Sequence, residues 1–207
     1  MISTQKKHWE TIYETKNPDQ VAWTQDIPKT SLDFINNCKL PKSSSIIDIG
    51  GGDSKLVDFL LDRGYTNISV LDISANALEK AKKRLGKRSK LINWIESDIA
   101  KFKPTKTYDI WHDRASFHFL TRPDQISKYL TIAEKHIKKH LIIGTFSEQG
   151  PTKCSGLEIQ QYNEESLKKI FKKYFKIINC INENHMTPFK TSQNFLFCNF
   201  KKIESTK

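Results

Sequence analysis

The sequence predicts an α/β fold in which helices cover both faces of a doubly wound, mainly parallel sheet. Short apolar runs alternate with amphipathic helical segments along most of the 207 residues. A glycine-rich turn, Gly50 to Gly52, follows the first central run. Asp72 ends the next run about 20 residues later, a spacing typical of nucleotide-binding βαβ units.

The apolar runs predict the strands of the sheet. Each is short and largely apolar, as expected for parallel strands that are buried on both faces. The predicted parallel strands are residues 46–49, 68–71, 91–95, 110–112 and 141–145, and residues 175–181 and 194–200 form a closing hairpin.

Helices are predicted between the strands by their capping residues. Gly64 ends a helix that begins near Asp53, and Ser74 and Gly86 bracket the next one. Asn163, followed by two glutamates, begins the last helix. The order of elements therefore fits a βαβ-type domain.

The glycine turn and Asp72 predict a ligand that contains adenosine. Glycines lack Cβ, so the backbone can turn sharply and approach a ligand closely. A carboxylate at the tip of the second strand can accept hydrogen bonds from both ribose hydroxyls. Lys55 stands where a dinucleotide-binding chain needs a third glycine, and no Walker lysine motif follows, so NAD and ATP are disfavoured.

Asp48, Gly50 and Gly52 resemble the D-x-G-x-G start of class I S-adenosylmethionine-dependent methyltransferases, although Ser54 stands where many members have another glycine. The resemblance continues with Asp72, with residues 97–99 and with residues 108–110. It implies S-adenosylmethionine as cofactor and S-adenosylhomocysteine as product. The residues that we expect to bind the cofactor are Asp48, Gly50, Gly51, Gly52, Asp72, Ile73, Ser97, Asp98, Ile99 and Trp23.

Residues 111–121 and 150–157 are similar to the citrate synthase lysine methyltransferase branch and its bacterial relatives. This resemblance implies a Rossmann-like, seven-stranded sheet with an antiparallel final strand. It also implies methylation of a protein lysine for the eukaryotic members and leaves the bacterial substrates open.

The segment 111–119 is expected to follow the fourth strand and to contact the methyl acceptor. Methyl transfer from a sulfonium needs no metal, and alignment of the reactants supplies much of the rate. A lysine acceptor, with a pKa near 10.4, must lose a proton, and Asp113 is our first candidate to accept it. His112 and Asp109 are further catalytic candidates, while an Asp113–Arg114 ion pair and buried core histidines are the structural alternatives.

Other side chains are expected around the acceptor and the cofactor. The predicted substrate-binding residues are Arg114, His118, Cys154 and Tyr162. His185, Phe189 and Gln193 are further candidates for an acceptor channel. Trp9, Tyr13 and Trp23 are expected to close over the methionine end of the cofactor, with core packing as the alternative.

Composition limits the remaining possibilities. The formal net charge of +11 permits a nucleic-acid partner, but no base-reading motif accompanies it, so a lysine-rich solvated surface is favoured. No run of about 18 apolar residues and no leader-like apolar core is found, which predicts a cytoplasmic protein. The four cysteines show neither zinc-ligand spacing nor a disulfide framework, so reduced thiols are expected.

We expect one methyltransferase domain over residues 1–207, with a helical lid at 1–40, a cofactor-binding core at 45–150 and an acceptor-side loop, helix and hairpin at 151–207. The leading prediction is methylation of a protein lysine nitrogen. A small-molecule thiol, amine or carboxylate acceptor is the alternative. A nucleic-acid-binding module and an inactive cofactor-binding scaffold are less favoured, and the sequence leaves the oligomeric state open.

Overall fold

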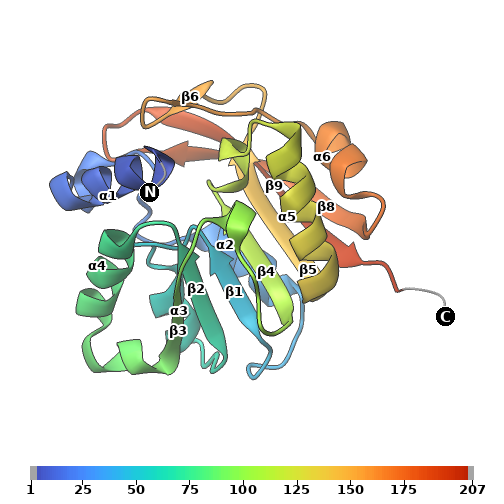
Figure 1. Ribbon diagram of the computed structural model, residues 1–207, viewed down its shortest axis with the longest axis horizontal. Coiled ribbons are helices and arrows are strands. Elements are labelled where there is room, and N and C mark those ends of the chain that lie inside the picture. The colour runs from blue at the N-terminus through green and yellow to red at the C-terminus, as the bar shows by residue number, and fades with distance from the viewer. Residues whose placement is uncertain (1–3, 205–207) are drawn as a thin grey trace.

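Seven strands form one sheet in the order β3-β2-β1-β4-β5-β9-β8 in the computed structural model, which describes residues 4–204 (Figure 1). The first five strands pair in parallel, whereas β9 (Ser192–Lys202) is antiparallel to both β5 and β8 (Phe175–Met186). The parallel strands are β1 (Ile46–Ile49), β2 (Ile68–Asp72), β3 (Ile92–Glu96), β4 (Tyr108–Arg114) and β5 (Ile137–Phe146). The predicted fold class is confirmed.

Helices cover both faces of this sheet, and a separate apolar cluster fills each interface. One face carries α2 (Lys29–Asn37), α3 (Leu56–Asp62) and α4 (Ala75–Leu85), and the other carries α5 (Pro123–His136) and α6 (Glu164–Phe171). The first helix, α1 (Thr4–Thr15), lies beside α4 instead of on the sheet (Figure 1). No helix in the described residues is long and apolar enough to cross a membrane.

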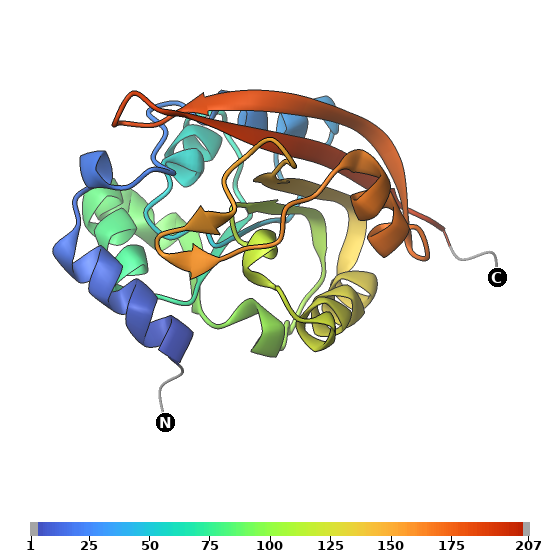
Figure 2. The ribbon, with the colours of Figure 1, turned by 90° about the horizontal axis from the view of Figure 1, so that it is seen from above.

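Short elements complete the chain. The two-stranded hairpin of β6 (Lys153–Cys154) and β7 (Leu157–Glu158) lies over the same end of the molecule as α1, as the view from above shows (Figure 2). The 3-10 helices are η1 (Pro18–Gln20), η2 (Gly86–Leu91), η3 (Ile99–Lys101) and η4 (Phe117–Phe119).

Predicted helix starts are confirmed by their hydrogen bonds. The Ser74 side chain accepts a bond from the backbone N–H of Ala77, and the Asn163 side chain accepts one from Ser166. These caps satisfy N–H groups that have no partner within a helix, which is why polar residues mark the starts in the sequence.

The fourth strand is longer than the predicted 110–112. It continues through His112, Asp113 and Arg114, and His112 and Asp113 pair with Asp48 and Ile49 of β1. The polar residues Asp113 and Arg114 lay beyond the predicted end of the strand, but the neighbouring strands keep the backbone extended. Because side chains alternate along a strand, Asp113 points to the opposite face from its two neighbours.

Two other expectations are corrected. α2 falls in the predicted lid, yet Leu32 and Ile35 are each 1% exposed and pack in the core beside the sheet. Cys180 and Cys198 face each other on β8 and β9 and form a disulfide, so the expectation of reduced thiols is wrong for this pair. Sequence spacing cannot reveal such a pairing, because it arises from strand register.

Candidate functional site

The glycine turn leaves β1 and makes the floor of the site. Gly50 has φ of +66° and Gly52 has φ of +30°, in the left-handed region that favours glycine. A Cβ on Gly50 would lie 2.8 Å from Cβ of Ser116, and one on Gly52 would lie 2.6 Å from Oδ2 of Asp72. The turn therefore brings the first, second and fourth strand ends together in a space that side chains would fill.

Asp72 ends β2 directly beside this turn. Its Oδ1 accepts a 2.8 Å hydrogen bond from the backbone N–H of Ser74, and its side chain lines the cavity described below. Burial, followed by the nearby carboxylates of Asp48 and Glu10, raises the pKa of Asp72 to about 7, against the opposing effect of the Ser74 N–H. A hydroxyl-bearing ligand would hydrogen-bond to this carboxylate and offset its burial.

A single cavity of about 430 Å³ adjoins these strand ends. Its wall includes Gly50, Gly51, Asp72, Arg114 and Cys154. The sequence-predicted cofactor residues that also line it are Asp48, Ile73, Ser97, Asp98, Ile99 and Trp23. Gly52 lies just behind the wall, against the Asp72 carboxylate. The volume is in the range of small-molecule sites.

The residues after β3 are fixed by local bonds. The Ser97 N–H donates to the Asp72 carbonyl at 2.9 Å, and the Asp98 Oδ1 accepts from the Ala100 N–H at 2.9 Å. The Asp98 side chain thus starts η3, and Ile99 behind it is 7% exposed. The polar Asp98 and the apolar Ile99 both line the cavity, an arrangement that suits a flat ring.

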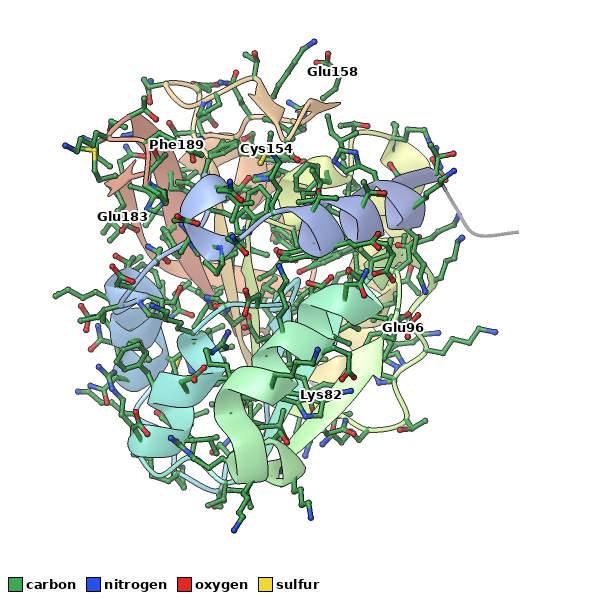
Figure 3. The ribbon with its side chains drawn as sticks, turned by 90° about the vertical axis from the view of Figure 1, so that its left-hand side faces the viewer. Lys82, Glu96, Cys154, Glu158, Glu183 and Phe189 are labelled. Atoms are coloured by element: carbon green, nitrogen blue, oxygen red, sulfur yellow. A yellow bond between two sulfur atoms is a disulfide. The ribbon has the colours of Figure 1, made fainter. Side chains whose placement is uncertain are left out.

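The helix α1 lies above α4 (Figure 3), and its side chains Gln5, Trp9 and Tyr13 line the cavity. The Glu10 carboxylate accepts hydrogen bonds from the Ser74 hydroxyl and from the backbone N–H groups of Ala75 and Asn76, at 2.8 to 3.0 Å. A carboxylate at a helix N-terminus is favoured by the helix dipole and by its free N–H groups. These bonds attach α1 to the start of α4.

Aromatic rings on α1 extend this cover across the cavity. Trp9 makes edge contacts with Trp23 and Phe119, with ring centroids 5.5 and 5.2 Å apart, and Tyr13 contacts Trp23. All four side chains line the cavity. Trp9, Tyr13 and Trp23 therefore lie where the predicted lid needs them, although Trp9 also packs as a buried residue.

His112 is buried between β1 and α2. Its Nδ1 lies 2.7 Å from Oδ1 of Asp48, and its Nε2 lies 2.9 Å from the Ser31 hydroxyl. Both ring nitrogens are thus engaged by protein groups. The triplet fixes the Asp48 carboxylate beneath the glycine turn, and His112 and Asp48 line the cavity.

Arg114 also lines the cavity, as does Cys154. Its Nη1 donates to the Trp23 carbonyl at 3.0 Å, and the guanidinium lies 4.8 Å from the Phe195 ring centroid. Cys154 is 7% exposed and burial raises the pKa of its thiol to about 12, so it is neutral at pH 7. Figure 3 shows Cys154 on the hairpin above α1 and Glu158 on its outer side.

Asp113 does not face the cavity, which corrects its predicted catalytic position. It is 0% exposed, and its carboxylate accepts hydrogen bonds from the Phe117 N–H at 2.9 Å and the Tyr129 hydroxyl at 3.0 Å. Burial raises its pKa to about 7, although these two hydrogen bonds act against the shift. The alternation of β4 sends this side chain toward α5, where it holds the following turn.

Other predicted residues also lie elsewhere. Asp109 is at the opposite end of β4, where its Oδ2 accepts bonds from the Ser45 N–H and hydroxyl, both at 2.9 Å. His118 is stacked on Phe146 at 4.7 Å and 0% exposed, and burial lowers its pKa to about 3. Neither residue is part of the cavity wall, so neither can contact an acceptor there.

The remaining acceptor-channel candidates are similarly corrected. Tyr162 is 3% exposed and packs on Phe117 in the core, on the side of the sheet away from Arg114, and burial raises its pKa above the ordinary value. Phe189 is 56% exposed outside the cavity. His185 is not part of the cavity wall, and its Nε2–H donates to the Ala22 carbonyl at 2.7 Å.

Sequence reasoning missed Glu10 and Ser31. Glu10 acts on residues more than 60 positions away, and nothing in the α1 pattern distinguishes it from other exposed helix carboxylates. Ser31 reaches His112 across 81 positions. Contacts of this kind arise from packing between elements, which leaves no local sequence signal.

Comparisons with known proteins agree with this geometry. Residues 46–140 match the family described as "Methyltransferase domain". Malonyl-[acyl-carrier protein] O-methyltransferase of Anoxybacillus flavithermus is 30% identical over 106 residues, which is 51% of this chain and 40% of that protein. The mouse eEF1A lysine and N-terminal methyltransferase is 24% identical over 166 residues, covering 69% of this chain and 23% of that protein. The chain thus spans less than half the length of either relative.

A solved structure supports the fold. The N-methyltransferase NodS from Bradyrhizobium japonicum, in complex with S-adenosyl-L-homocysteine, superposes with a TM-score of 0.69 over 94% of this chain and 98% of that one, at 16% identity. The prediction of a methyltransferase-type, Rossmann-like fold is confirmed. The narrower resemblance to the citrate synthase lysine methyltransferase branch stays a prediction.

Proposed function

We propose that this protein transfers the methyl group of S-adenosylmethionine to a small-molecule acceptor. One observation carries the proposal: the same cavity is lined by the glycine turn and Asp72 and also by the side chains of Arg114 and Cys154. The glycine turn and Asp72 fit a nucleoside, and we assign Arg114 and Cys154 to the methyl acceptor. The match of residues 46–140 to a methyltransferase domain and the structural likeness to NodS support this reading.

The residues fit this cofactor for a physical reason. Gly50 and Gly52 provide a cradle that any Cβ would fill, and the buried Asp72 carboxylate is matched by ribose hydroxyls. S-adenosylmethionine, when bound, supplies an activated methyl group on a positively charged sulfur. The protein's own residues then bind, orient and enclose the reactants, and such positioning accounts for much of the catalysis in a direct displacement.

The division of the chain follows the same proposal. Residues 45–150 would bind the cofactor, and residues 151–207, which carry Cys154, would contribute to the acceptor side. We propose a lid that consists of α1 and the segment through Trp23. A cytoplasmic location stays a prediction.

Methylation of a protein lysine is the second candidate. The mouse relative, whose name includes lysine methylation, favours it. Against it, Asp113 and Asp109 are used elsewhere in the fold, and the charged group at the acceptor end is the cation Arg114, which repels a lysine ammonium. The small-molecule proposal therefore takes precedence.

Incubation with S-adenosylmethionine labelled in its methyl group tests the two candidates. The protein is mixed with cell extract that has been separated into dialysable small molecules and retained proteins. We expect label in the small-molecule fraction, and none with the Gly50→Arg variant. Label confined to proteins would favour the lysine candidate, and no label in either fraction would reject the proposal.

The two control variants separate loss of cofactor binding from loss of fold. A Cβ at residue 50 would lie 2.8 Å from Cβ of Ser116, so Gly50→Arg forces a side chain into occupied space. Asp72→Asn keeps the shape of the side chain and removes its charge. Both should unfold cooperatively in a thermal melt. Gly50→Arg should fail to bind S-adenosylhomocysteine at the concentration that saturates the unaltered protein, and Asp72→Asn should bind it about 10- to 100-fold more weakly.

A further inference from the structure

Arg114 is a buried cation with unused hydrogen-bond donors. Its Nη1 donates to the Trp23 carbonyl, but Nε and Nη2 are closed off from solvent and have no partner among residues 4–204. Burying the N–H donors of a charged group without hydrogen-bond partners lowers the stability of the fold by several kcal/mol. The side chain lines the cavity, so a ligand is the natural source of the missing acceptors.

The groups around Arg114 do not neutralise it. His118 and His185 have lowered pKa values, mainly through burial and also through the Arg114 charge, and the Cys154 pKa is raised, so all three are uncharged at pH 7. The Phe195 ring contacts the guanidinium face and offers no lone pair. These neighbours stabilise the position of Arg114 without using its donors.

Two carboxylates lie in the electrostatic surroundings of Arg114. Glu183 on β8 acts on it most strongly, but no ion pair within 4.0 Å joins them among the described residues, and Glu183 Oε2 also lacks a partner there. Asp48 is the second, and its carboxylate is already bonded to His112. The acidic residues thus moderate the buried charge and leave two donors free.

We propose that Arg114 binds a carboxylate of the methyl acceptor, so that the acceptor is a small organic acid. This inference rests on the proposed function and narrows it. The planar guanidinium presents paired N–H groups that match a carboxylate in two parallel bonds. The net charge of +11 adds long-range attraction for such an anion.

The methionine part of the cofactor carries the same chemical group. Arg114 would serve the cofactor instead of the acceptor if it held that carboxylate. The two sources of the carboxylate differ in one measurable quantity. If Arg114 binds the cofactor, the affinity for S-adenosylhomocysteine depends on Arg114, and if it binds the acceptor, this affinity does not.

Variants at Arg114 distinguish these sources. Arg114→Gln removes the charge and keeps a polar side chain, Arg114→Lys keeps the charge without the paired N–H groups, and Arg122→Gln is a matched control at an exposed arginine, 67% accessible. Thermal melts establish that each variant folds. Calorimetry with S-adenosylhomocysteine measures the cofactor site, and transfer of labelled methyl groups measures the acceptor site.

The acceptor assay uses dialysable extract divided on an anion-exchange resin into bound and unbound pools. We expect the unaltered protein and Arg122→Gln to label a compound from the bound, anionic pool. Arg114→Gln should lower this labelling at least 100-fold with S-adenosylhomocysteine affinity within twofold of normal. Arg114→Lys should retain a few per cent of the labelling.

The other outcomes overturn the inference in distinct ways. A fall of more than tenfold in S-adenosylhomocysteine affinity for Arg114→Gln would assign the arginine to the cofactor. Label taken only from the unbound pool, or labelling that is insensitive to Arg114→Gln, would reject the organic-acid acceptor and leave the proposed function intact. Absence of label from both pools would reject the proposed function itself.

Discussion

The Asp72 carboxylate is almost fully buried and also lines the cavity. Its side chain is nearly enclosed, with 5% of the residue exposed, and its pKa is raised to about 7 from the ordinary value of 3.8. The ionised form, which accepts hydrogen bonds best, is therefore the form that destabilises the ligand-free fold. Binding of ribose hydroxyls would compensate for this penalty.

Asp72→Asn should strengthen the ligand-free fold and weaken the cofactor site. Because the folded-state pKa is raised, the penalty from ionisation is absent below about pH 4 and grows as the pH rises through the window from 3.8 to about 7. The variant should melt above the unaltered protein at about pH 8, with the difference shrinking toward about pH 4. S-adenosylhomocysteine affinity should fall about 10- to 100-fold, as expected for lost bonds to a charged group.

Thermal melts across this pH range and calorimetry check the two effects together. Asp62→Asn, at a surface carboxylate paired with Arg88, is the control and should change neither quantity. An Asp72→Asn variant that binds S-adenosylhomocysteine normally would contradict the ribose role. One that melts lower than the unaltered protein at about pH 8 would contradict the buried-charge penalty.

Asp113 belongs to a different network, in which its function is structural. The Trp111 indole N–H donates to the Tyr129 hydroxyl at 3.0 Å, and this hydroxyl donates to Asp113. The carboxylate also accepts the Phe117 N–H and so fixes the turn that leads from β4 to η4. All of these groups are buried, so none can obtain a replacement partner from solvent.

Tyr129→Phe tests this network by removing one oxygen. The Trp111 N–H and one Asp113 oxygen would lose their shared partner, which should lower the free energy of unfolding by about 1–3 kcal/mol. S-adenosylhomocysteine affinity should stay within twofold. Denaturant unfolding measures the first quantity, with Tyr174→Phe on the partly exposed surface as a control. An unchanged stability would show that the network contributes little.

At the scale of elements, α1 is attached to the domain mainly through α4. Glu10 satisfies the first N–H groups of α4, and the Asn76 side chain returns a bond to the Glu10 carbonyl at 3.2 Å. Lys80 adds a bond to the Lys16 carbonyl at 2.6 Å. The helix that begins just after Asp72 thus connects the Asp72 end of the cavity to the cover formed by α1.

Glu10→Ala should loosen this cover without unfolding the sheet. Loss of three accepted bonds at a helix N-terminus removes the polar contact between α1 and α4, while the apolar core is untouched. S-adenosylhomocysteine affinity should fall about tenfold, and limited proteolysis should cut sooner between Thr15 and Trp23. Glu14→Ala, on the exposed side of the same helix, is the control. Equal affinity and equal proteolysis in both variants would show that the Glu10 hydrogen bonds do not hold α1 over the cavity.

For the whole molecule, the cavity draws on residues between positions 5 and 154 of the 207-residue chain. Its wall extends from Gln5 on α1 to Cys154 on the hairpin, and it includes the ends of β1, β2 and β4. A ligand in this cavity contacts parts that are distant in sequence, so it stabilises the folded arrangement of all of them.

S-adenosylhomocysteine should therefore raise the melting temperature of the whole domain. At a concentration 100-fold above the dissociation constant, the stabilisation is about 2.7 kcal/mol, which corresponds to roughly 5–10 °C for a domain of this size. A thermal melt followed by circular dichroism checks this in a single transition. Asp72→Asn at the same ligand concentration should show a clearly smaller shift, and an absent shift in the unaltered protein would count against the cofactor assignment.

The sequence by itself determined the order of strands and helices along the chain, the position of the glycine turn and the position of the Asp72 carboxylate at the end of a strand. Those features depend on local properties: apolar runs, capping residues and the absence of a Cβ. It also led to the methyltransferase-type fold, because the motifs occur in a fixed order along the chain.

Only the tertiary structure decided which side chains face the cavity. His112, Asp113 and Arg114 are consecutive, yet the extension of β4 through all three sends Asp113 into a hydrogen-bonded core and leaves Arg114 on the cavity wall. The hydrogen bonds of Glu10 to the start of α4 likewise come from helix packing, and the Cys180–Cys198 disulfide comes from strand register. Such contacts join residues that are far apart in sequence, so the local pattern around each residue cannot specify them.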